Sequence, residues 1–146
     1  MNIEQGQSNS CLRHGVPEFI VRKAHESYDH VLETIKNIPD HWTNAHVILF
    51  LHIVTNRFPE LLEKDLSSFE NASRMNQANN NGSTPVCIAA QNGHANVIRV
   101  LHSLGADVNK TDNNGSTPVY AAAYSGHENV IRVLHSLGAD VNKTDN

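Results

Sequence analysis

The chain has 146 residues, of which 39% are hydrophobic and 18% are charged, a composition that favours one globular domain over a disordered chain. Eleven Lys and Arg residues face fifteen Asp and Glu residues, the net charge is −4 and no basic run occurs, which argues against a nucleic-acid or anionic-membrane surface. Two cysteines, Cys11 and Cys87, are too few for a disulfide framework and indicate a reducing compartment such as the cytoplasm.

The N-terminal half of the chain predicts helices after a short tail. Residues 1–15 lack both the basic start and the apolar core of a signal peptide. We therefore expect them to form a flexible tail. Residues 16–75 are expected to be helical, beginning with one helix over Pro17–Asn37, where apolar residues recur at helical spacing. Residues 42–55 are apolar nearly all round and should be buried between neighbours. Arg57–Leu62 resembles a degenerate start of a second helix.

Two near-identical copies follow. The segment GSTPVCIAAQNGHANVIRVLHSLGADVNKTDN starts at Gly82 and returns at Gly115. Twenty-seven of the 32 aligned residues are identical, which identifies an internal repeat. The positions that differ are Cys87/Tyr120, Ile88/Ala121, Gln91/Tyr124, Asn92/Ser125 and Ala95/Glu128.

Each copy predicts two short helices and a turn. Thr84 is typical of an N-cap and Pro85 of the first helical residue, and Gly93 ends this first helix. A pair of helices this short cannot bury its apolar side alone, so neighbouring copies should stack. In the second helix, one apolar stripe is formed by Val97, Ile98, Leu101 and Leu104.

The motifs Thr-Pro, Ala-Ala, Gly-His and Leu-Gly-Ala-Asp-Val-Asn occur in this order in both copies, at the fixed offset from Gly82 to Gly115, and together they resemble the ankyrin repeat. The resemblance covers two repeats at residues 76–146. It implies an all-α ankyrin-repeat solenoid, in which helix-turn-helix units with short hairpin turns stack side by side. Thr-Pro is followed by Val-Cys or Val-Tyr where the family usually has Leu-His, and His102 and His135 stand where it usually has Leu, which indicates a less apolar packing layer.

The resemblance also bears on both ends of the chain. Residues of about 42–75 are interpreted as a degenerate ankyrin-like repeat, and Pro17–Asn37 as an N-terminal helical cap, which solenoids need. The sequence stops inside the turn that would open a third copy. We therefore expect a longer array to have been truncated here, and the uncapped C-terminal repeat is a candidate surface for self-association.

The family resemblance implies a partner-binding surface made by the hairpin tips and the exposed side of each first helix. The differences between the copies have two explanations, drift after duplication or recognition, and a pair of tyrosines on an Asn/Ser background favours recognition. Carried over by motif, the predicted partner-binding residues are Asn80, Asn81, Ser83, Gln91, Asn92, Asn113, Asn114, Ser116, Tyr120, Tyr124 and Ser125.

The sequence predicts no catalytic residue, no cofactor and no metal site. Cys11 and His14 could pair as nucleophile and base, but no third partner or oxyanion hole accompanies them. Equivalent histidines of stacked repeats, such as His94 and His127, should lie about 8–10 Å apart, too far to share a zinc ion. We expect these two to hydrogen-bond the loop between helices instead.

The leading hypothesis is a protein–protein interaction module whose concave groove binds a partner protein, with no nucleic-acid binding and no membrane insertion. The alternative is the targeting part of a larger secreted effector or enzyme that acts on host proteins, with its catalytic domain outside this chain. In that case the protein would work in the host cytoplasm.

Overall fold

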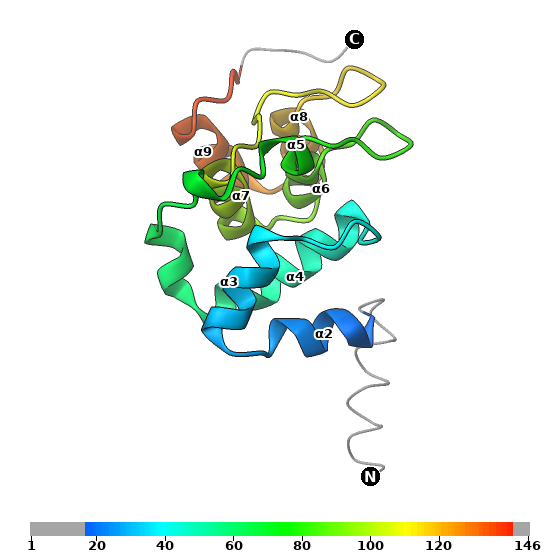
Figure 1. The fold of residues 1–146 in the computed structure, drawn as a ribbon. Helices are drawn as coiled ribbons and strands as arrows, with labels where there is room; N and C mark the ends of the chain where they lie inside the picture. The colour runs from blue at the N-terminus through cyan, green and yellow to red at the C-terminus, as the bar shows by residue number, and fades with distance from the viewer. Residues whose placement is uncertain (1–16, 142–146) are drawn as a thin grey trace, which may run out of the picture.

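The computed structural model describes residues 17–141, and all regular secondary structure in this range is helical (Figure 1). The predicted tail at residues 1–15, with Cys11 and His14, lies outside the described residues, as do residues 142–146. In chain order the elements are α2 (Glu18–Ala24), α3 (Tyr28–Lys36), α4 (Asn44–Arg57), the 3-10 helices η1 (Pro59–Glu63) and η2 (Ser67–Phe69), α5 (Ala72–Met75), α6 (Pro85–Gln91), α7 (Ala95–Ser103), α8 (Pro118–Tyr124) and α9 (Glu128–Ser136).

The helices stack in two layers. Helices α2, α4, α6 and α8 follow one another in the first layer, each packed against the next. In the second layer α7 packs against α9 on one side and against η1 on the other. Figure 1 shows the hairpin loops before α6 and before α8, green and yellow, projecting from the same side of this stack. The all-α stacked architecture predicted from the repeat is confirmed.

The local signals in each copy act as predicted. The Thr84 hydroxyl accepts a hydrogen bond from the Cys87 amide at 3.3 Å, and Thr117 accepts one from the Tyr120 amide at 3.0 Å. Both threonines are buried, and a proline follows each as the first helical residue. These caps satisfy amides that have no partner within the helix.

Asparagine side chains join successive units at equivalent positions of the repeat. Asn76 donates to the carbonyl of Gly105 at 3.1 Å and accepts from the amide of Asp107 at 2.7 Å. Asn109 repeats both bonds one unit later, donating to Gly138 at 3.4 Å and accepting from the Asp140 amide at 2.8 Å. The repeated polar contact keeps one unit in register with the next.

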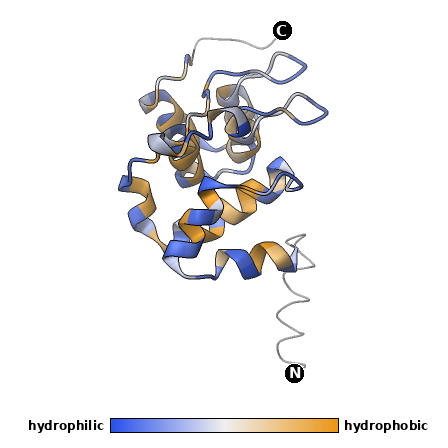
Figure 2. Ribbon diagram, in the orientation of Figure 1, coloured by the Kyte–Doolittle hydropathy of each residue, from blue (hydrophilic) through white to orange (hydrophobic). Residues whose placement is uncertain are grey.

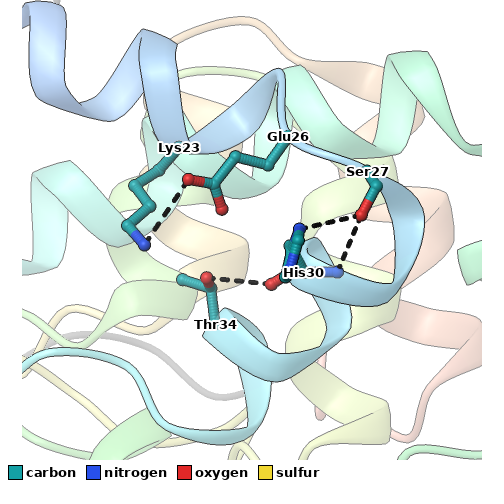
Figure 3. Close-up of polar contacts among 5 residues, drawn as sticks. All are labelled: Lys23, Glu26, Ser27, His30 and Thr34. Carbon is teal, nitrogen blue, oxygen red and sulfur yellow. Dashed lines mark hydrogen bonds and ion pairs between the residues drawn. The ribbon is translucent and has the colours of Figure 1, made fainter.

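The single helix predicted over Pro17–Asn37 is wrong. The structure has two helices, α2 and α3, which turn at residues 25–27. Ser27 caps α3: its hydroxyl accepts from the His30 amide at 3.3 Å and contacts Nδ1 of the same residue at 3.0 Å, while Lys23 pairs with Glu26 at 3.6 Å (Figure 3). The apolar period runs on through the turn, because Ala24 and Val31 are both fully buried, so periodicity alone could not reveal it.

Arg57 holds this turn from the next unit. Its Nη1 donates to the carbonyl of Ala24 at 2.7 Å and to that of Glu26 at 2.8 Å, and its guanidinium lies 4.5 Å from the ring centroid of Phe58. Carbonyls at the end of a helix lack partners within the helix. The cation at the end of α4 therefore stabilises the corner where α2 ends.

The second helix suggested by Arg57–Leu62 is replaced by the short 3-10 helix η1. Pro59 is its first residue, and Leu61 is buried in the core. Two further short helices, η2 and α5, lead back to the hairpin before α6, with Leu66 and Met75 also buried. This unit therefore places apolar side chains against α7 without a full-length helix.

The hydrophobic core runs through the whole stack, and equivalent residues of the two copies are buried in it to different extents. Hydrophobic residues gather in the helices, whereas the hairpins are hydrophilic (Figure 2). Ile98 is fully buried, but its counterpart Ile131 is only half-buried. Likewise Val108 is 6% exposed and Val141 is 43% exposed. The following unit covers the first copy, whereas no described residue covers the second in the same way.

Candidate interaction surface

The two hairpins are folded by one side chain each. Asn79 accepts hydrogen bonds through Oδ1 from the amides of Asn81 at 2.9 Å and Ser83 at 3.0 Å. Asp112 makes the same bonds in the second hairpin, from Asn114 at 2.9 Å and Ser116 at 3.0 Å. Either a side-chain amide or a carboxylate at this position can therefore fold the hairpin.

The hairpins are also bonded to each other. The amide of Asn113 donates to the carbonyl of Asn81 at 3.1 Å, and its side chain donates to the carbonyl of Asn80 at 3.3 Å. Part of the polar surface predicted to bind a partner is thus used to hold the tips side by side. The tips form one connected edge.

Helix α8, the first helix of the second copy, carries the most exposed aromatic side chains in the described chain. On α8, Tyr124 is 82% exposed and Tyr120 is 43% exposed. Their ring centroids lie 6.2 Å apart with an interplanar angle of 24°, the geometry of a stacked pair one helical turn apart. In the first copy the corresponding residues are Gln91 and Cys87, and no aromatic surface is present there.

The surfaces of the two copies differ at the position of Cys87 and Tyr120. The side chain of Cys87 is only 5% exposed, and the thiol lies 3.5 Å from the carbonyl of Lys110, to which it donates. Burial raises the pKa of the Cys87 thiol, although its contact with Thr84 acts in the opposite direction. The thiol therefore stays protonated. Cys87 is buried, whereas Tyr120 at the same position of the next copy extends to the surface.

A cleft of about 140 Å³ lies between the second hairpin, α8 and the end of α6. It brings together five of the predicted residues and two that sequence reasoning missed, Asp112 and Ala121. Asp112 could have been found from its alignment with Asn79 in the preceding repeat. The predicted residues in this cleft are Gln91, Ser116, Tyr120, Tyr124 and Ser125.

The other predicted residues lie outside the cleft. All of them are exposed except Ser83, which is half-buried. Those on the hairpins form the edge described above, and Asn92 follows the end of α6. They are Asn80, Asn81, Ser83, Asn92, Asn113 and Asn114.

The repeat histidines have structural contacts. His127 lies with Nε2 3.1 Å from the carbonyl of Gln91, so its contact is with the last residue of α6 in the preceding unit and not with the loop predicted for it. The His94 ring instead packs against that of His52 of α4, with ring centroids 4.2 Å apart and an interplanar angle of 35°. Burial, and then the neighbouring His52 and His127, lower the pKa of His94.

Two kinds of site were not found within residues 17–141. Within them, no group of three or more His, Cys, Asp or Glu side chains is arranged to hold a metal ion. Over the same range, no helix combines the length and the apolar character that a membrane crossing requires.

Comparison with known proteins agrees with this geometry. The family model described as "Ankyrin repeats (3 copies)" matches residues 50–145, from the middle of α4 to the end of the second copy. Among curated proteins, none matches this chain.

Proposed function

This chain belongs to the ankyrin-repeat family, whose repeats are generally protein–protein interaction modules, and on this premise we propose that it binds a partner protein through its hairpin edge and the exposed side of α6 and α8. The family and the helical solenoid predicted from the sequence are thereby confirmed. In this proposal the protein contributes a binding surface and no chemistry of its own, as is typical of ankyrin domains.

The observation that carries the proposal is the exposed pair of Tyr120 and Tyr124. Large aromatic side chains exposed beside polar groups are typical of binding anchors. Among the other large hydrophobic side chains of the described chain, only Val141 is exposed to the same extent as Tyr120. Tyr124 does not support the fold, because it is 82% exposed.

Rigidity supports the proposal as well. The hairpins are held by side-chain caps and by bonds between them, and α6 and α8 pack against each other. A surface that is already ordered loses little conformational entropy when it binds. Its contacts then contribute more fully to affinity.

The experiment is affinity capture of partner proteins by the full chain and by the Tyr120→Ala/Tyr124→Ala variant. His135→Ala, on the exposed side of α9, is the matched control. A partner that depends on the tyrosines should then bind Tyr124→Ala about 5- to 150-fold more weakly, or about 1–3 kcal/mol, with an unchanged urea midpoint. Equal capture by the wild type and the double variant would refute the proposal.

A further inference from the structure

The divergence between the two copies is concentrated at one place. Of the five differing positions, four line the cleft beside α8: Tyr120, Ala121, Tyr124 and Ser125. The fifth is Glu128, which forms an exposed ion pair with its own helix. Two copies that are otherwise identical over this segment thus differ in the composition of this cleft.

A further difference adds a negative charge at the same place. Asp112 lines the cleft, and its counterpart in the first copy is Asn79. Because Asn79 folds its hairpin with the same two hydrogen bonds, at 2.9 and 3.0 Å, the charge of Asp112 is not needed for the turn. The negative charge of Asp112 is therefore not required by the fold and is available to a ligand.

The chemistry of the cleft fits a cation. Faces of tyrosine rings carry negative partial charge and attract guanidinium and ammonium groups. Asp112 adds a full negative charge, and the remaining lining residues include no Lys, Arg or His. The chain as a whole carries a net charge of −4, which favours encounter with basic partners.

We propose that this cleft binds an arginine side chain on a basic segment of the partner protein, with the guanidinium between the Tyr120/Tyr124 pair and the Asp112 carboxylate. Arginine suits the site better than lysine because its flat, weakly hydrated guanidinium stacks on aromatic rings while it donates to a carboxylate. The inference rests on the proposed function and names the chemistry of the partner at that surface.

The first copy is an internal control for this assignment. At the equivalent place it has Asn79, the buried Cys87 and Gln91, which supply neither an aromatic face nor a formal charge. The same backbone fold therefore carries a cation site in one unit and none in the other. Only the second unit is expected to discriminate between basic and neutral peptides.

The test is selection of short random peptides displayed on phage, with the full chain as the target and Tyr120→Ala/Tyr124→Ala for counter-selection. Peptides that need the tyrosines should be enriched in arginine. In synthetic versions, replacing that arginine by citrulline should weaken binding about 2- to 30-fold, and lysine should recover part of the loss.

Asp112→Asn gives a second variant that keeps the hairpin acceptor. It should weaken arginine peptides about two- to fivefold and reduce the salt dependence of binding, while leaving the citrulline peptide unchanged. Tyrosine-dependent peptides without basic residues, or with affinities insensitive to citrulline, would overturn the arginine assignment and leave the proposed function standing. A selection that yields no tyrosine-dependent peptide would overturn both.

Discussion

Ile98 and Ile131 occupy the same position in two copies with the same helix sequence from Asn96 to Ser103 and from Asn129 to Ser136, yet the structure buries them unequally. Ile98 is fully buried in α7, where the following unit covers it, and Ile131 is half-buried in α9. Replacing each by alanine removes the same three carbon atoms. The difference in cost therefore measures the contribution of the neighbouring unit alone.

The magnitude follows from burial. Each buried methyl or methylene group contributes about 0.8 kcal/mol, so Ile98→Ala loses about 2.4 kcal/mol from transfer, and a cavity raises the loss toward the range of about 2–5 kcal/mol. Ile131→Ala should lose about half as much, because part of its side chain is already in contact with water and the site can relax into solvent.

Urea denaturation followed by circular dichroism measures both losses as shifts of the midpoint at constant slope. Both substitutions change helix propensity identically, so propensity does not contribute to the comparison. Equal losses would refute the reasoning, because they would show that stacking on the next unit adds nothing at this position. A larger loss for Ile131→Ala would reverse the assignment of the covered side.

The glycines after the first helices give a second matched pair. Both Gly93 and Gly126 have φ near +80°, and a Cβ at Gly93 would lie 2.8 Å from the ring of His127, whereas Gly126 has nothing within 4 Å; Gly126→Ala should cost about 1–2 kcal/mol and Gly93→Ala about 1–3 kcal/mol more, and equal melting temperatures would contradict this. Burial beside His52 and His127 lowers the pKa of His94, so the unfolded chain takes up this proton first and stability should fall as the pH drops through about 6.5. His94→Asn should flatten that fall in urea titrations between pH 7.5 and 5, and parallel wild-type and variant curves would exclude His94 as its source.

The repeat predicted most of the fold because it combines many local signals in one period. Thr84 and Pro85 start a helix through their own chemistry, and Gly93 ends one through its freedom at positive φ. Such signals act within a few residues, so they can be read from the sequence without knowledge of the tertiary contacts. The turn between α2 and α3 was missed because its apolar residues keep their helical period on both sides of Ser27.

The interaction surface was predicted in part. Tyr120, Tyr124 and Ser125 were singled out because they differ from the first copy, and the structure brings all three into one cleft. Asp112 was missed because the alignment of residues 82–113 with 115–146 pairs it with Asp145 and not with Asn79 of the preceding hairpin. Its approach to α8 depends on how the turn packs, which no local pattern specifies.

By itself, the sequence determined the period, the helix ends within the two copies and the family, because capping, turn chemistry and apolar spacing are local properties. Only the tertiary structure decided which of two identical residues is buried, as for Ile98 and Ile131, and which side chains meet at the cleft of Asp112, Tyr120 and Tyr124. The physical reason is that burial and electrostatic environment depend on the neighbours that stacking brings together, and identical segments at different places in a stack have different neighbours.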